Sequence, residues 1–354
     1  MFEKQIASAQ ENLKQLIAIP SLSRNESQAA DRVAAMIVEN GFTPQRHGNN
    51  VWCIAPDFTV EKPILLLNSH IDTVKPVDGW NSDPFTPVET EESITGLGAN
   101  DAGASLVCLF ETFLILSRTP QSYNLIFLAS CEEEVSGAGG VESVLPLLPP
   151  ISCGIVGEPT GMRMAVAEKG LIVFDCYVKG VAGHAAHGGG DNAIYKSLEV
   201  IDQVKNFLFP RVSHLLGEVR KTVTMIQAGT QHNVIPDLCS FVIDVRSNEL
   251  YTNQEIFDAF RKYLPCEVKP RSLRLNSSFI DSKHPIVLRA KKMEMELFGS
   301  PTLSDQSLMP FPTVKMGPGD TTRSHTANEY ILKKEIKGAI PKYVALLDGL
   351  QLNS

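Results

Sequence analysis

The chain has 354 residues, a length that favours two domains over a single hydrophobic core. Hydrophobic residues make up 43% and charged residues 20%, which is typical of a folded globular protein and excludes disordered and collagen-like chains. The formal charge of −8, from 32 basic and 40 acidic residues, gives little electrostatic support for a nucleic-acid partner.

Residues 1–21 alternate charged with apolar side chains and lack the continuous apolar core of a signal peptide. This pattern predicts a helix over Ser8–Ala18, followed by a second helix over Glu26–Asn40 that ends at Gly41. Because no stretch of about 20 apolar residues follows, we expect a cytoplasmic protein with no membrane partner. The seven cysteines form no CxxC pair, which predicts reduced core residues.

Three short, continuous apolar runs are typical of strands that are buried on both faces of a mainly parallel sheet. They are Pro63–Ser69, Asn124–Ser130 and Ser152–Val156. Between the first two runs, Ala102–Arg118 predicts a crossover helix. Strand, long helix and strand in this order indicate an α/β layered domain, in which ligands gather beyond the carboxyl ends of the strands.

From Gly170 onward, three segments alternate apolar with polar side chains, as half-buried antiparallel strands do. These segments are Leu171–Val178, Lys221–Gln227 and Phe241–Arg246. A helix is expected over Asn192–Phe209. We therefore predict an inserted α+β, ferredoxin-like domain at residues 170–277, within a catalytic domain made of residues 1–169 and 278–354.

Potential metal ligands follow each of the three buried runs. His70 and Asp72 follow the first run, and three consecutive glutamates, Glu132–Glu134, follow the second. Glu158 follows the third, and Asp101 begins the crossover helix. These side chains share one sheet edge, where so many like charges would repel strongly without a cation. Imidazole and carboxylate ligands without thiolates suit zinc, cobalt or manganese in an open, hydrolytic site.

Eight short motifs resemble the acetylornithine deacetylase and succinyl-diaminopimelate desuccinylase family of di-zinc peptidases and aminoacylases. They are SHIDTV (69–74), GLGAND (96–101), CEEEVSG (131–137), GEPT (157–160), GHAAHGGGDNAI (183–194), NVIPD (233–237), IDVR (243–246) and SHTANEY (324–330). Each motif alone is a weak signal, but the eight occur in the family's order and span nearly the whole chain. The resemblance implies a zinc-peptidase-like catalytic domain with an inserted dimerisation domain.

The resemblance also implies two zinc ions per subunit, for which cobalt can substitute. One ion would be held by His70 and Glu158, and the second by Glu134 and His325. Asp101 would bridge both ions.

In the sequence His70-x-Asp72, the carboxylate is well placed to orient the imidazole of His70. The resemblance further implies that Glu133 is the general base. The family usually has Asp-Glu-Glu where this chain has three glutamates, so a register shifted by one residue stays open, with Glu132 as the base and Glu133 as a ligand. We prefer Glu133 and Glu134 because the following residues, 135–137, have the family's spacing.

Outside the metal ligands, His184 resembles the family's hydrogen-bond donor to the oxyanion, with His187 as its rival. Asn233 and Arg246 match family positions near the substrate, where an arginine can bind a carboxylate bidentately. Arg323, close to the ligand motif at 324–330, is a further candidate for binding the substrate.

The resemblance implies a metal-dependent amide hydrolase that removes an acetyl-type group from a small amino acid such as ornithine or citrulline, in arginine biosynthesis. Desuccinylation of diaminopimelate type and dipeptide cleavage stay open, because the motifs do not separate them. We expect a cytoplasmic homodimer that acts on a small-molecule N-acyl amino acid. A binding protein on a degenerate peptidase fold is disfavoured, because every expected ligand and the base are present.

Overall fold

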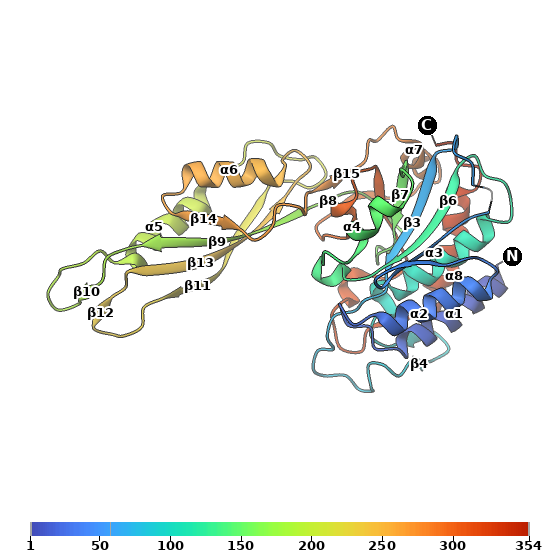
Figure 1. Cartoon of the computed structure of the whole chain (residues 1–354), viewed down its shortest axis with the longest axis horizontal. Helices are drawn as coiled ribbons and strands as arrows, with labels where there is room; N and C mark the ends of the chain where they lie inside the picture. Colours follow the sequence, from blue (N-terminus) through green and yellow to red (C-terminus); the bar gives the residue numbers. More distant parts are fainter. Residues whose placement is uncertain (1, 57, 353–354) are drawn as a thin grey trace. The chain divides into compact units, whose positions relative to one another are not determined.

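The computed structural model describes residues 2–56 and 58–352, in two compact units (Figure 1). Unit 1 comprises Met1–Val166, Phe279–Phe298 and Ser304–Ser354, and unit 2 comprises Ala167–Ser278 and Gly299–Leu303. Our prediction placed the boundaries at 170 and 277 and assigned the short segment Gly299–Leu303 to the catalytic domain. The two units are described separately below.

Unit 1 is built from a large mixed sheet and several helices. Its helices and short helical turns are α1 (Glu3–Ile17), α2 (Ser27–Glu39), η1 (Ala99–Gly103), α3 (Ala104–Leu116), η2 (Glu133–Val135), α4 (Val141–Val144), η3 (Leu145–Leu147), α7 (Pro285–Lys292), η4 (Asp305–Leu308), η5 (Thr321–Arg323) and α8 (Lys333–Leu347). Its strands are β1 (Gln45–His47), β2 (Asn50–Ile54), β3 (Ile64–His70), β4 (Val88–Glu89), β5 (Ser93–Thr95), β6 (Asn124–Ser130), β7 (Cys153–Val156), β17 (Thr313–Lys315) and β18 (Tyr330–Leu332). Three strands run across the boundary between the units, namely β8 (Met164–Glu168), β15 (Ser278–Phe279) and β16 (Leu297–Ser300).

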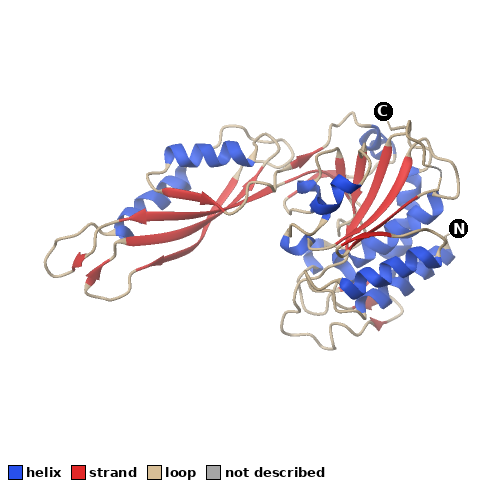
Figure 2. Ribbon diagram, viewed as in Figure 1, coloured by secondary structure: helices blue, strands red, loops and turns tan. Residues whose placement is uncertain are grey.

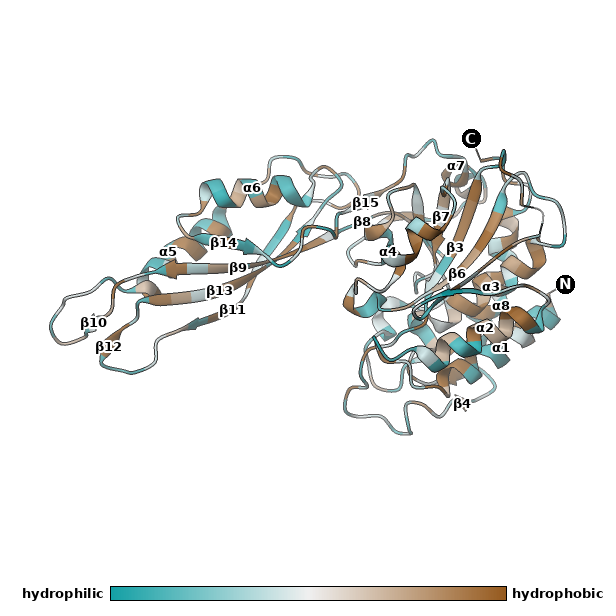
Figure 3. Cartoon of the chain, viewed as in Figure 1, coloured by the Kyte–Doolittle hydropathy of each residue, from teal (hydrophilic) through white to brown (hydrophobic). Residues whose placement is uncertain are grey.

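The main sheet has the strand order β1-β2-β6-β3-β7-β17-β8-β15, with β16 paired to β8. Its centre is parallel, because β3 pairs in parallel with both β6 and β7, and β7 with β17. Every residue of β3 and β6 is buried, and Figure 3 draws both strands mainly in brown. The continuous apolar runs of the sequence are therefore the central strands of an α/β layered sheet, as predicted.

Helices cover both faces of this sheet (Figure 2). Side chains of α1, α2, α3 and α8 form one large core with one face of the sheet, and α4 contributes to a smaller core on the other face. The segment Ala99–Leu116 is apolar and long enough to cross a membrane, but 83% of it is buried. Helix α3 packs against α1, α8 and β3, so this segment is a core helix of unit 1.

Unit 2 is an α+β domain with a four-stranded sheet. Its elements are β9 (Gly170–Lys179), β10 (Gly183–His184), α5 (Ala193–Asn206), β11 (Arg220–Ala228), β12 (Val234–Ile235), β13 (Leu238–Ser247), α6 (Asn253–Tyr263) and β14 (Glu267–Pro270). The sheet order is β11-β13-β9-β14 with every neighbour antiparallel, which is the ferredoxin-like βαββαβ arrangement. Burial alternates along β9 and β13, and their buried residues pack with side chains of α5 and α6.

Strand β11 is an edge of the unit 2 sheet, and most of its residues are exposed. Two of its apolar side chains, Met225 and Ile226, are 55% and 51% exposed. An exposed apolar edge strand is a template for pairing with another chain. A small two-stranded sheet of β10 and β12 also belongs to this unit.

Candidate metal centre

The predicted ligands of unit 1 lie at the carboxyl edge of its parallel strands. His70 is the last residue of β3, and Glu158 follows β7 closely. Glu133 and Glu134 lie in η2, which begins three residues after the end of β6. Asp101 lies in η1, in front of α3. The parallel order of the strands is what brings these segments to one edge, as the sequence predicted.

Two groups of side chains at this edge have the spacing of metal ligands. In the first group, His70 Nε2 lies 3.4 Å from Asp101 Oδ1 and 3.6 Å from Glu158 Oε1. In the second, His325 Nε2 lies 3.0 Å from Glu134 Oε2 and 3.7 Å from Asp101 Oδ2. The ligand atoms of each group all lie within 4.8 Å of one another. Asp101 therefore contributes one oxygen to each group.

These residues fit a pair of neighbouring divalent metal ions. Each group offers one imidazole and carboxylates, a donor set shared by zinc, cobalt and manganese sites. A carboxylate whose two oxygens face different groups is suited to bridge two ions. Three protein ligands per ion also leave room for water or substrate, as catalytic sites require.

In the protein without metal ions, the clustered carboxylates raise the pKa values of neighbouring groups, as expected of a site that attracts cations. Burial, together with the charge of Glu158, raises the pKa of Glu133 well above its ordinary value. Burial and the charge of Asp101 have the same effect on the pKa of Glu158. The hydrogen bond to Glu134 raises the pKa of His325 to about 9. Without metal ions, protons therefore offset part of the negative charge at this edge.

Metal binding should consequently release protons. The pKa of His325 is raised from 6.5 to about 9, so its imidazole is mostly protonated at pH 7 and must lose that proton to bind a metal ion. We expect metal affinity to rise by up to about tenfold per pH unit between pH 7 and 9 for this proton, and to level off above pH 9. Calorimetric titration of the metal-free protein in two buffers of different ionisation enthalpy measures the number of protons released. A value near zero at pH 7 would contradict this expectation.

The His70 ring lies closer to the backbone carbonyl of Asp72 than to the carboxylate of that residue. Its Nδ1 lies 2.9 Å from the carbonyl oxygen of Asp72 and 3.5 Å from a carboxylate oxygen of the same residue. The Nδ1–H group therefore donates to the carbonyl, which leaves Nε2 free to face the other ligands. The Asp72 carboxylate instead accepts the N–H groups of Glu133 and Glu134 at 3.0 and 3.1 Å and the hydroxyl of Ser23 at 2.7 Å. It holds the turn that carries two predicted site residues.

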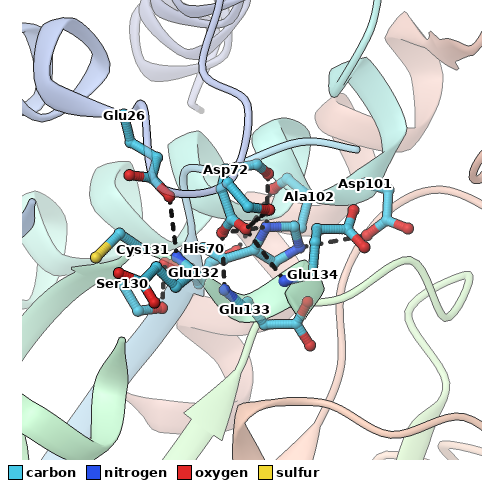
Figure 4. A network of polar contacts seen from close by, with 12 residues as sticks. Glu26, His70, Asp72, Asp101, Ala102, Ser130, Cys131, Glu132, Glu133 and Glu134 are labelled. Carbon is cyan, nitrogen blue, oxygen red and sulfur yellow. Dashed lines mark hydrogen bonds and ion pairs between the residues drawn. The ribbon is translucent and has the colours of Figure 1, made fainter. Parts of the chain in front are cut away.

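The three consecutive glutamates point in different directions. The Glu132 carboxylate lies 3.8 Å from Arg24 and sits against the backbone of Gly137, where an added Cβ would clash with it. Figure 4 shows the side chains of Glu133 and Glu134 on the opposite side of the turn from Glu26, whose carboxylate accepts the Glu132 N–H. This arrangement favours the register in which Glu133 is the base and Glu134 the ligand.

Glu329 is a site residue that our sequence analysis did not single out. It is 2% exposed, and its Oε1 accepts the backbone N–H groups of Asn100 and Asp101 at 2.8 and 2.9 Å. Burial raises its pKa to about 7. Glu329 thus holds the segment that carries Asp101, the residue shared by the two groups. The motif SHTANEY (324–330) contains Glu329 as well as His325, and this was the sequence signal that could have identified Glu329.

The two predicted substrate-binding arginines already have partners in the protein. Arg323 donates to both oxygens of Glu335 at 2.7 and 3.1 Å, and the two side chains are only 17% and 20% exposed. Since this guanidinium is occupied by a largely buried carboxylate, we do not retain Arg323 as a substrate-binding residue. Arg246 donates to both oxygens of Asp244 at 2.8 and 3.1 Å, but this pair lies on one strand and is 35% and 29% exposed. A partly exposed pair is weak enough for a substrate carboxylate to compete with.

The other two candidates lie on the small β10–β12 sheet of unit 2. His184 pairs with Val234 in the sheet register, and its Nδ1 accepts the N–H of Ala186 at 3.1 Å. Its ring centroid lies 4.9 Å from that of His187. Asn233 precedes β12, and its carbonyl oxygen accepts the N–H of Ala185 at 2.9 Å. Within unit 2, His184 and Asn233 are therefore close in space, although about 50 residues separate them in the chain.

Comparisons with known proteins agree with this architecture. Residues 166–271 match the peptidase dimerisation domain, and residues 50–147 match peptidase family M28. The acetylornithine deacetylase of Erwinia tasmaniensis is 28% identical over 352 residues, which cover 90% of this chain and 91% of that protein. The succinyl-diaminopimelate desuccinylase of Wolbachia pipientis is 24% identical over 282 residues, which cover 75% of this chain and 71% of that protein.

Solved structures show the same fold over almost the whole chain. A tripeptidase from Staphylococcus aureus has a TM-score of 0.77 at 19% identity and covers 97% of this chain and 98% of its own. A dinuclear metal-binding peptidase of the M20 family from Bacillus subtilis has a TM-score of 0.73 at 18% identity, and the match covers 98% of both chains. The chain is therefore related to the acetylornithine deacetylases and succinyl-diaminopimelate desuccinylases, as its motifs predicted, and has the M20 peptidase fold with its dimerisation domain.

Proposed function

We propose that this protein hydrolyses the amide bond of an N-acyl amino acid and removes an acetyl group from a small amino acid such as ornithine or citrulline. The single observation that carries the proposal is the pair of ligand groups that share Asp101, with Glu133 beside them. His70 and Glu158 would hold one zinc ion, and Glu134 and His325 the other, with cobalt able to replace zinc. Ions in these positions would acidify a water molecule and polarise the substrate carbonyl.

The proton transfers fall to Glu133 in this proposal. Its carboxylate is partly buried, and desolvation together with the charge of Glu158 raises its pKa well above the ordinary value, which suits a group that accepts and returns a proton. It would take the proton of the attacking water and then give it to the nitrogen of the leaving amine. Asp72 would keep this residue in place, because it accepts the backbone N–H of Glu133. The products are a carboxylic acid and a free amino acid.

We further propose that His184 donates a hydrogen bond to the carbonyl oxygen as negative charge develops on it. This histidine belongs to unit 2, whereas the ligand groups belong to unit 1. The exposed edge strand β11 and the match to a dimerisation domain support a homodimer, in which His184 would act in the partner's site.

A mixture of two inactive variants tests this assembly. His184→Ala and Glu133→Gln should each be inactive alone. If His184 acts in the partner's site, a heterodimer of the two variants contains one site with both residues intact. At equal mixing, random assortment under two-fold symmetry restores about a quarter of wild-type activity. No recovery after verified subunit exchange would mean that His184 acts within its own chain or not at all.

The substrate is proposed to carry a free α-carboxylate that Arg246 binds, with Asn233 nearby. Amidation of this carboxylate on the best substrate should lower kcat/KM at least about tenfold, equivalent to roughly 1.4 kcal/mol of transition-state binding. The comparison uses matched acid and amide substrates with the wild-type enzyme and with Arg246→Ala. In the variant the difference between acid and amide should shrink. Equal turnover of both by the wild-type enzyme would contradict the proposed contact.

A substrate panel tests the proposed reaction itself. The metal-loaded protein would be assayed with acetyl and succinyl derivatives of ornithine, citrulline, arginine and diaminopimelate, and with simple dipeptides. We expect the acetylated amino acids to be hydrolysed fastest, which would be consistent with arginine biosynthesis in the cytoplasm. Preference for the succinyl compounds would favour the alternative of a desuccinylase, which the similarity to both kinds of relative also supports. Preference for dipeptides would favour a dipeptidase, and no hydrolysis at all would refute the proposal.

A further inference from the structure

The turn that carries the proposed base is held by two buried carboxylates from different parts of unit 1. The backbone N–H of Glu132 donates to Glu26 Oε1 at 3.2 Å, and the next two N–H groups, of Glu133 and Glu134, donate to the two oxygens of Asp72. Figure 4 shows both carboxylates beside the turn. Three consecutive backbone donors are thus bound by acceptors outside the turn.

Glu26 is fully buried and positioned by three donors. Its Oε1 accepts the N–H of Arg24 at 2.5 Å in addition to that of Glu132, and its Oε2 accepts Nδ2 of Asn49 at 2.9 Å. A buried carboxylate is costly unless such donors compensate it. Its two oxygens therefore have distinct tasks: Oε1 holds the backbone at Glu132, while Oε2 anchors the side chain to the loop at Asn49.

The backbone at Glu132 requires this support. Its φ of 56° and ψ of 21° lie in the left-handed region, as do those of Ser136 at the other end of the turn. Non-glycine residues in this conformation are strained and persist where the surrounding structure determines them. The bond from the Glu132 N–H to Glu26 is one such determinant, and it lies directly before the proposed base.

We propose that Glu26 is a positioning residue for Glu133, acting through the backbone of Glu132. By holding Glu132 in its left-handed conformation, Glu26 sets the direction in which the next side chain leaves the turn. Misplacement of a catalytic group by about 1 Å can cost a hundredfold in rate. This inference rests on the proposed role of Glu133 as the base. It adds Glu26, from the N-terminal segment, to the residues that position this base.

The test compares kcat, KM and bound metal in wild type, Glu26→Ala, Glu26→Gln and the double variant Glu26→Gln with Asn49→Asp. Alanine removes the acceptor, and we expect kcat to fall about a hundredfold with KM and metal content within twofold of wild type. Glutamine keeps one acceptor oxygen, but its amide N–H groups face the amide N–H groups of Asn49. We therefore expect kcat to fall about tenfold in Glu26→Gln. In the double variant the carboxylate introduced at position 49 accepts from the glutamine amide, which frees Oε1 for the Glu132 N–H. We expect kcat to recover to within about threefold of wild type.

Glu111→Gln is the matched control. Glu111 is also a buried carboxylate of unit 1, 3% exposed, but it lies in α3 and its side chain is hydrogen-bonded to Ser8. The kcat of Glu111→Gln should stay within twofold of wild type. This result would show that loss of a buried carboxylate is not sufficient to slow turnover. If Glu26→Ala does not fold, Glu26→Gln and the double variant still decide the matter.

Three results would overturn the inference. The first is a wild-type kcat in the single variants Glu26→Ala and Glu26→Gln while Glu133→Gln is inactive. This result would refute the role of Glu26 and leave the proposed function intact. The second is loss of bound metal in proportion to activity, because Glu26 would then act on the ligand Glu134. The third is full turnover by Glu133→Gln, in which case the assignment of the base fails first and this inference fails with it.

Discussion

Replacing Glu133 by Gln should lower kcat by about 10²- to 10⁴-fold while the protein keeps its full complement of bound metal. The amide has nearly the size of the carboxylate but cannot accept a proton, and general acid–base catalysis contributes rate factors of this order. The side chain is partly buried, and desolvation together with the charge of Glu158 raises its pKa, as suits a group that accepts and returns a proton. Metal content by elemental analysis and single-turnover kinetics of the purified variant measure the two quantities separately.

Glu132→Gln is the matched control for this prediction. The Glu132 carboxylate lies towards Arg24 and against Gly137, where an amide of the same size can be accommodated. We expect its kcat to stay within a few-fold of wild type, with normal metal content. The reverse pattern, in which Glu132→Gln loses turnover and Glu133→Gln loses metal, would mean that the register of base and ligand is shifted by one residue.

Replacing Asp101 by Ala should remove both metal ions and all measurable hydrolysis. Its two carboxylate oxygens lie 3.4 Å from His70 Nε2 and 3.7 Å from His325 Nε2, one in each ligand group. Loss of this side chain therefore leaves each group with one ligand fewer, whereas Glu158→Ala or Glu134→Ala depletes only one group. Elemental analysis should give close to zero ions for Asp101→Ala and about one ion for each of the other variants.

Chelation provides the complementary experiment on the wild-type protein. Exhaustive removal of metal should abolish hydrolysis, and addition of zinc or cobalt should restore it. Asp244→Ala, which removes an acidic side chain of unit 2 outside the ligand groups, should bind metal normally. Full activity after verified removal of metal, or an Asp101→Ala protein that still binds two ions, would contradict the proposed centre.

The positions of the ligands along the chain were predictable because they follow from the order of buried strands. Continuous apolar runs can be recognised without a structure, and parallel strands necessarily place their carboxyl ends at one edge. The pattern alone therefore predicts that His70, Glu158 and the three glutamates Glu132–Glu134 lie close together. His325 could not be found in this way, because it does not follow a buried strand directly but lies ten residues beyond the end of β17. It was identified only through its motif.

The inserted domain was predictable for a related reason. Alternation of apolar and polar residues along β9, β11 and β13 distinguishes half-buried antiparallel strands from the fully buried strands of unit 1. The pattern of apolar and polar residues therefore changes close to Ala167, where unit 2 begins. The inclusion of Gly299–Leu303 in unit 2 has no such signal, because it depends on packing between distant segments.

The sequence by itself determined the family resemblance, the mainly parallel sheet and the identity of the candidate ligands. Only the tertiary structure decided how each charged side chain is used. Glu26 meets the backbone of Glu132 across 106 residues, and Glu329 meets that of Asn100 across 229 residues. The Arg323 guanidinium likewise forms a salt bridge with the carboxylate of Glu335. A hydrogen-bond partner depends on direction and distance in space, and a local pattern of residue types records neither, so these contacts appear only when the chain is folded.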